Sequence, residues 1–171
     1  MRWLADLLPF FVFGESYGGM VAQRAAMTDQ RISAVICAAS PAWPWDAVAS
    51  ALRFTRFPFS VSAGHLINAY HGFNIMADGD PRVHTQPVQE PRFLYLIGDQ
   101  DHHDPANTRK VWDSFYPDKR ADPDKGPTEA PNQLKWFHLI KGAGHGDIIN
   151  SPLLYSDMNA LIDLVLRRQV S

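Results

Sequence analysis

The chain has 171 residues, of which 46% are hydrophobic and 20% charged, and its 16 basic and 18 acidic side chains give a formal net charge of -2. This composition is that of a globular protein with one hydrophobic core, and it excludes the disordered and fibrous classes. There is no basic stripe and no apolar run of the ~20 residues that a membrane span needs, so we expect no nucleic-acid partner and no membrane span. The first eight residues are too short and too polar for a signal peptide, which leaves the cytoplasm as the default compartment.

The N-terminal part of the chain alternates between apolar runs and a helix-forming run. Residues 2–8 have a helical spacing of apolar residues that Pro9 stops, and residues 10–13 form a short apolar run typical of a strand buried in a parallel sheet. Residues 20–27 favour a helix, and residues 32–38 favour the next strand, in which the single cysteine has a packing role. Strand, turn, helix and strand in this order predict a parallel α/β layer.

Residues 41–90 interrupt this alternation. Seven aromatic residues crowd into this segment among its prolines. We interpret it as a mainly helical lid or cap insertion, in which Asp46 caps a helix over residues 47–54. The core domain then comprises residues 1–40 and 91–171.

The alternation resumes after the insertion. Residues 93–97 and 136–140 favour strands, and residues 106–115 and 152–168 favour helices. Between them, residues 117–133 are polar and rich in proline, as expected of a loop. The predicted fold class is therefore α/β, with about four parallel strands flanked by helices.

The segment Gly14-Glu15-Ser16-Tyr17-Gly18 fits the G-x-S-x-G pattern of a nucleophile elbow. At an elbow the chain turns sharply from a strand into a helix and leaves the serine exposed, so we expect that a side chain at Gly14 or Gly18 would collide with its neighbours. A glycine-rich turn with an incidental serine also matches the pattern. The apolar strand before it and the helix after it favour a catalytic Ser16.

Polar, ionisable residues follow the third predicted strand. Open α/β sheets place their sites at the carboxyl ends of the strands, so we expect the acid partner of the serine here. One alternative is a solvated loop that caps the next helix, which suits Asp104. The other is a metal cluster, which we do not favour because adjacent histidines at a strand end point apart. Its members would be Asp99, Asp101, His102, His103 and Asp104.

A histidine with three nearby glycines follows the last predicted strand. His145 lies in the run Gly142-Ala143-Gly144-His145-Gly146, which would let the imidazole turn into a site at that strand end. The alternative is a histidine on a surface loop. His138 lies within a strand and is expected to be a packed residue. The histidines of the insertion are expected to lie on the surface or to contact substrate; they are His65, His71 and His84.

The order Ser16, Asp101, His145 is that of the α/β-hydrolase fold, and differs from that of chymotrypsin or subtilisin. From the elbow to its last helix the chain resembles the α/β-hydrolase superfamily. The resemblance implies that the four strands are the family's fifth to eighth and that residues 41–90 are its lid. It also selects Asp101 over Asp99 as the acid, three residues after the glycine that ends the strand. The elbow is similar to those of serine carboxypeptidases and some aminopeptidase or esterase branches.

The resemblance implies a serine hydrolase that cleaves an ester, thioester or amide bond through a Ser-His-Asp triad and an acyl-enzyme intermediate. The expected substrate is an apolar small-molecule or peptide acyl compound, with no cofactor and no metal. The backbone N–H of Tyr17 would supply one oxyanion-hole donor. The alternatives are an acyltransferase on the same triad and a truncated, inactive half-domain.

The family's first four strands have no equivalent before the elbow, and neither has the loop that supplies the second oxyanion donor. We therefore expect the chain to be a fragment. In the family's strand order, the run from Phe10 to Phe13 would then be a bare sheet edge. We expect the chain to self-associate through this edge.

Overall fold

The computed structural model describes residues 8–41, 92–103, 125–133 and 135–170, together with residues 65, 66, 69, 70, 105 and 109. The elements within these residues are β1 (Phe10–Glu15), α1 (Tyr17–Thr28), β2 (Ile32–Ala38), β3 (Arg92–Gly98), β4 (Lys135–Ile140), the short 3-10 helix η3 (His145–Asn150) and α6 (Pro152–Val170). The four predicted strands, and the helices predicted over residues 20–27 and 152–168, recur within a few residues of their expected limits. The α/β class is therefore confirmed.

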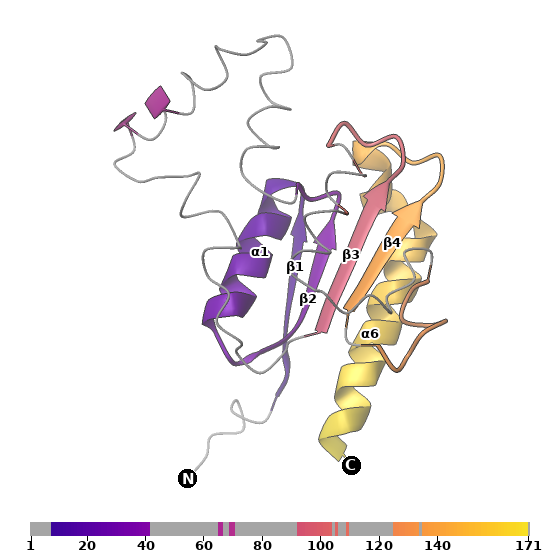
Figure 1. Ribbon diagram of the computed structural model, residues 1–171. Helices are drawn as coiled ribbons and strands as arrows, with labels where there is room; N and C mark the ends of the chain where they lie inside the picture. The colour runs from indigo at the N-terminus through magenta and orange to yellow at the C-terminus, as the bar shows by residue number, and fades with distance from the viewer. Residues whose placement is uncertain are drawn as a thin grey trace.

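The four described strands form one parallel sheet in the order β1-β2-β3-β4 (Figure 1). The registers place Val12 beside Val35, and Leu94 between Ile36 and Trp136. Because all four strands run in the same direction, their carboxyl ends lie together at one end of the sheet. Residues that follow β1, β3 and β4 are therefore brought together, although they lie far apart in the sequence.

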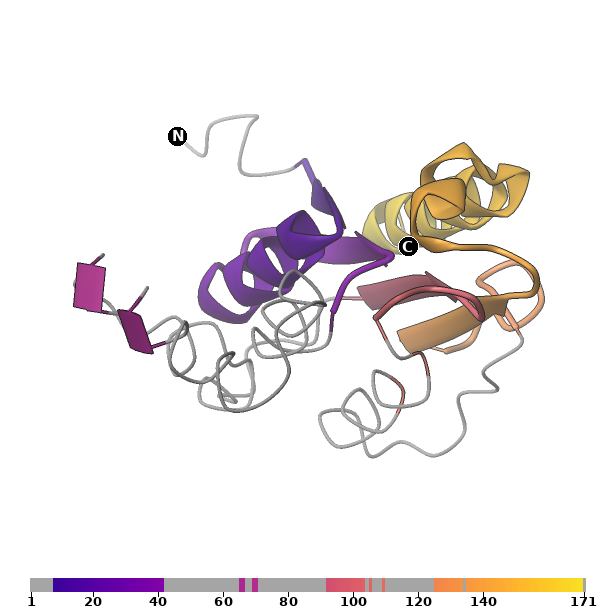
Figure 2. The same cartoon turned by 90° about the horizontal axis from the view of Figure 1, so that it is seen from above.

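Side chains of the sheet alternate between two hydrophobic cores, and α1 and α6 cover opposite faces (Figure 2). Ala22 of α1 packs in the same core as Val35. Leu154 of α6 packs in the other core with Ile36. A strand that is covered on both faces favours apolar residues on both, which explains the apolar run of β2 after Ser33.

Two predictions about buried residues in the core are confirmed. Cys37 is buried, and its Sγ lies 3.4 Å from the carbonyl oxygen of Gly19. Burial raises the pKa of this thiol to about 12, so it stays protonated and unreactive. His138 of β4 is also buried, and its Nδ1 lies 2.7 Å from Oδ2 of Asp157 on α6, so its polar atom is paired within the fold.

Several predicted features lie outside the described residues. These are most of the helix before Pro9, most of the insertion at 41–90 with its Asp46 cap, most of the helix over 106–115, and Asp104. Within the insertion, residues 65, 66, 69 and 70 are helical and exposed. The lid assignment stays a prediction. None of the described helices is both long enough and apolar enough to cross a membrane.

β1 forms one edge of the described sheet. Among the described residues it pairs with β2 alone. Phe10 and Phe13 are 47% and 43% exposed. β1 therefore combines an unpaired side, among the described residues, with two partly exposed aromatic rings, as expected for an edge strand that can pair with another strand.

We predict that the purified chain self-associates through this edge and that Phe13→Lys shifts it toward the monomer. A lysine on an edge strand opposes edge-to-edge pairing. At a half-exposed position its ammonium group can also reach water without disturbing the core. Val12 is a poorer choice because it packs against the core on the α1 side. Light scattering gives the mass of each variant.

Tyr155→Lys is the matched control, because it places the same charge at an exposed aromatic residue of α6, away from the edge. It is expected to leave the association unchanged. A monomeric wild-type chain, or equal dissociation by both lysines, would contradict an association through β1.

Candidate active site

Ser16 occupies the sharp turn between β1 and α1. Its φ of 51° and ψ of -126° are rarely adopted by residues other than glycine. The Ser16 N–H donates to the carbonyl oxygen of Ala38 on β2 at 2.9 Å, and the Ser16 carbonyl accepts from the N–H of Gly19 at 3.0 Å. These two bonds hold the serine in a strained conformation at the carboxyl end of the sheet.

Of the two glycines at which a collision was expected, the structure confirms one. A Cβ at Gly14 would lie 2.2 Å from the carbonyl oxygen of Gly18, so a side chain there would collide with the backbone. At Gly18 a Cβ would meet nothing within 4 Å, and the prediction of a collision there is wrong. The second close approach is at Gly19, where a Cβ would lie 2.5 Å from the Ser40 side chain. Gly18 points into open space, whereas Gly14 and Gly19 face each other and the end of β2.

The loop after β3 buries the carboxylate of Asp101. This side chain has no exposed surface, and its Oδ1 accepts the backbone N–H of His103 at 2.9 Å. Both carboxylate oxygens lie 3.1 Å from Nδ1 of His145. Asp99 is exposed, and its Oδ1 accepts the N–H of Gly142 at 2.7 Å. Asp101 therefore contacts the histidine, while Asp99 ties the loop after β3 to the loop after β4.

His145 begins η3, directly after the glycine-rich loop that follows β4. The carboxylate of Asp147 accepts the N–H of Gly144 at 2.8 Å and fixes the start of this short helix. The imidazole is 25% exposed, and its Nε2 lies 3.0 Å from Oγ of Ser16. Because Nδ1 faces a carboxylate, it carries the imidazole proton, and Nε2 presents its lone pair to the serine hydroxyl.

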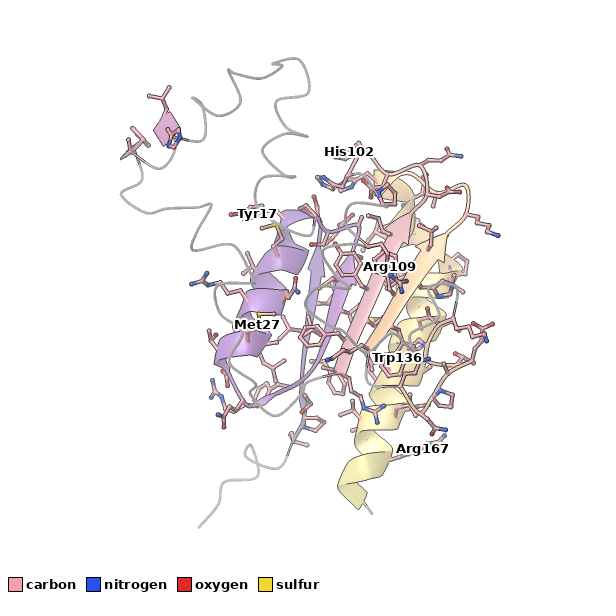
Figure 3. The ribbon with its side chains drawn as sticks, in the orientation of Figure 1. Tyr17, Met27, His102, Arg109, Trp136 and Arg167 are labelled. Atoms are coloured by element: carbon pink, nitrogen blue, oxygen red, sulfur yellow. The ribbon has the colours of Figure 1, made fainter. Side chains whose placement is uncertain are left out.

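The structure thus places Ser16, His145 and Asp101 in one row of hydrogen bonds. Their distances are within the range at which a base can take the proton of a nucleophile. The three residues follow β1, β4 and β3, whose carboxyl ends lie at the same end of the sheet. Figure 3 shows Tyr17 and His102 at this carboxyl end, one from the start of α1 and the other from the loop after β3. Tyr17 opens α1, where the first N–H groups of a helix have no acceptor within the helix.

Two further imidazoles surround His145. The ring centroids of His102 and His103 lie 4.2 Å and 4.9 Å from that of His145, and 4.4 Å from each other. The expectation that adjacent histidines point apart is wrong here, because it holds for an extended strand and these two residues lie on a bend. Burial, with His102 as the next cause, lowers the pKa of His103 to about 4, so this ring is uncharged at neutral pH.

These rings also form a group that could hold a metal ion. One ligand atom from each of four side chains lies within 4.8 Å of the others, in the part of the chain that the structure describes. The group comprises Asp101, His102, His103 and His145. Asp99 is not a member, in contrast to the cluster considered from the sequence.

No family model and no curated protein matches the chain. Solved structures do match it. The monoacylglycerol lipase of Paleococcus ferrophilus is 20% identical with a TM-score of 0.52, and the match covers 92% of this chain and 68% of the lipase. BpoC of Mycobacterium tuberculosis H37Rv, proposed to be a non-heme bromoperoxidase, is 15% identical with a TM-score of 0.51, and the match covers 94% and 69%.

The chain has the α/β-hydrolase fold. Its four described parallel strands and the extent of these matches carry this conclusion. A third structure, VinJ, matches with a TM-score of 0.50 over 91% of this chain and 66% of its own length. The chain therefore spans about two thirds of the length of these solved structures. The resemblance inferred from the elbow and the order of the site residues is confirmed at the level of the fold.

Proposed function

We propose that this chain is a serine hydrolase in which Ser16, His145 and Asp101 are the catalytic triad. The single observation that carries the proposal is the row of hydrogen bonds from Ser16 Oγ through the imidazole to the buried carboxylate. The positive φ of Ser16 supports it, because a strained serine held by its own backbone bonds is typical of a nucleophile elbow. The bond cleaved is an ester, thioester or amide.

In the proposed reaction Ser16 Oγ attacks the carbonyl carbon of the substrate while His145 Nε2 takes the hydroxyl proton. The imidazolium that forms is stabilised by Asp101, whose two oxygens both face Nδ1. His145 then gives the proton to the leaving group, and an acyl-enzyme remains on Ser16. Water, activated by the same imidazole, attacks the acyl-enzyme and releases the acid.

The backbone N–H of Tyr17 is the proposed oxyanion donor. It belongs to the first residue of α1, so it has no intrahelical acceptor, and it lies at the positive end of the helix dipole. A single donor of this kind is worth about 10²–10³ in turnover. We propose an apolar acyl group as substrate, because the insertion at 41–90 is rich in aromatic residues and the Tyr17 ring beside the nucleophile is exposed.

An alkyl fluorophosphonate tests the proposal, because only an activated serine reacts with it readily. The folded chain should gain one phosphonyl group, and peptide mass spectrometry should place that group on Ser16. Chain denatured before the addition is the control and should stay unlabelled, because activation requires the folded row of hydrogen bonds. Absence of labelling, or labelling at another residue, would refute the assignment. A labelled Ser16 with product formed only when an alcohol or thiol acceptor is present would assign an acyltransferase instead.

A further inference from the structure

The carboxyl end of the sheet, where the three proposed triad residues lie, also holds two imidazoles that the proposed reaction does not use. His102 and His103 pack on the ring of His145, and His102 Nδ1 lies 3.6 Å from Oδ1 of Asp101. We propose that these side chains form a Zn²⁺ site whose occupation switches the triad off. Its ligands are Asp101, His102, His103 and His145. The metal binding stands on these contacts, whereas the inhibition rests on the proposed function.

The geometry is close to that of a zinc site. The four ligand atoms already lie within 4.8 Å of one another. Zn–N and Zn–O bonds of about 2.0–2.2 Å place tetrahedral ligands about 3.3–3.6 Å apart, so the group has to contract by no more than about 1.5 Å. His102 is exposed, so its ring can rotate without displacing core residues. The approach of His145 to Asp101, at 3.1 Å, needs no contraction.

The ligand set selects the metal. Three imidazoles and one carboxylate are ligands that zinc accepts in its usual four-coordinate geometry. Ca²⁺ and Mg²⁺ prefer sites built of oxygen ligands alone, and only one carboxylate is present here. Asp101 is buried, so it offers a negative charge that water screens little. We therefore expect Zn²⁺ to bind and Ca²⁺ and Mg²⁺ not to compete with it.

Either nitrogen of His145 gives the same outcome for the triad. A metal on Nε2 removes the lone pair that faces Ser16 Oγ. A metal on Nδ1 leaves the single imidazole proton on Nε2, which then cannot take the serine proton. In both cases Ser16 keeps its proton, and Asp101 is drawn to the metal. Zinc therefore blocks the base at either nitrogen of His145.

Direct binding is the first test. A tag-free chain stripped with a chelator is titrated with Zn²⁺ against a chromogenic zinc indicator, and one Zn²⁺ per chain is expected. His102→Ala should weaken binding at least about tenfold, because even the partners that only orient metal ligands are worth about 10- to 100-fold in affinity. His65→Ala, which removes an exposed histidine of the insertion, is the matched control and should leave the affinity unchanged.

His103 is buried, so His103→Gln is checked for folding by circular dichroism before its zinc affinity is measured. If His103→Gln unfolds, the zinc affinity of His102→Ala alone tests the proposed site. Ser16→Ala should bind Zn²⁺ as tightly as the wild type, because Ser16 is not a ligand. Binding without 1:1 stoichiometry, or His102→Ala with wild-type affinity, would overturn the site.

The inhibition is measured by fluorophosphonate labelling of Ser16 with and without one equivalent of Zn²⁺. Labelling of the wild type should stop and return after chelation, while His102→Ala should still be labelled at the same Zn²⁺ concentration. Stoichiometric zinc binding in a chain that never reacts with the phosphonate would uphold the site and overturn the proposed function. Labelling that persists in the zinc-saturated wild type would overturn the switch.

Discussion

Ser16→Ala is expected to abolish hydrolysis of a chromogenic short-chain ester while the chain stays folded. The serine is the only proposed nucleophile, and in subtilisin the loss of the equivalent hydroxyl costs about 2 × 10⁶ in turnover. The hydroxyl contacts His145 Nε2, and alanine adopts the backbone conformation of Ser16 at a similar cost. The fold should therefore be unaffected. Steady-state kinetics and a thermal melt of the purified variant measure the two effects.

Ser33→Ala is the control for this experiment. Ser33 lies near the start of β2, at the end of the strand opposite the site, so its removal should leave kcat/KM unchanged. If Ser16→Ala hydrolyses the ester at close to the wild-type rate, Ser16 is not the nucleophile. A melt that collapses in Ser16→Ala would show that the hydroxyl is needed for folding.

Elements of the sheet follow from the sequence because their signals are local. Residues 32–38 are apolar at every position except Ser33, as expected of a strand that is covered on both faces. Ser16 could be selected in the same way, since its pattern, the strand before it and the helix after it all lie within one short segment. Because Asp101 and His145 follow later parallel strands, they were then expected at the same carboxyl end of the sheet as Ser16. These predictions needed only the rule that parallel strands end together.

What the sequence did not predict depends on contacts and backbone bends that a residue pattern does not show. The close approach at Gly19 involves Ser40, which lies beyond the next strand, so the pattern drew attention to Gly18 instead. The two neighbouring histidines meet because Asp101 accepts the N–H of His103, a side-chain turn that bends the chain back. The sequence shows the Asp-His-His run, but the direction of its bend is set by where the carboxylate lies.

The loop that presents His145 illustrates the same limit. Its glycines indicated a flexible approach, whereas the structure fixes it from both sides. Asp99 accepts the N–H of Gly142, and Asp147 accepts the N–H of Gly144. We therefore propose that Asp99 positions the loop of His145, while Asp101 is the acid of the proposed triad. Choosing between two aspartates two residues apart required the resemblance to a family, because both follow the same strand end.

This division of roles makes Asp101→Asn and Asp99→Asn a matched pair. Asp101→Asn is expected to lower turnover by about 10⁴, the loss that the corresponding change causes in chymotrypsin. The structure gives the reason. Oδ1 of Asp101 accepts the His103 N–H, so the asparagine oxygen is held there and the amide NH₂ takes the place of Oδ2. That NH₂ can only donate to Nδ1 of His145, and the oxygen that also lies near Nδ1 is already engaged by the His103 N–H.

An Nδ1 that accepts a hydrogen bond carries no proton, so the imidazole proton moves to Nε2 and points at Ser16 Oγ. The base is then in the wrong tautomer at every pH at which the ring is neutral. Asp99→Asn keeps an oxygen that can accept the Gly142 N–H, so it should lower kcat by no more than about tenfold, close to the cost of one weakened hydrogen bond. Ester kinetics of the two variants at neutral pH measure the difference. Similar losses at both positions would mean that the buried carboxylate does not set the tautomer of His145, and that Asp99 acts on the base as directly as Asp101 does.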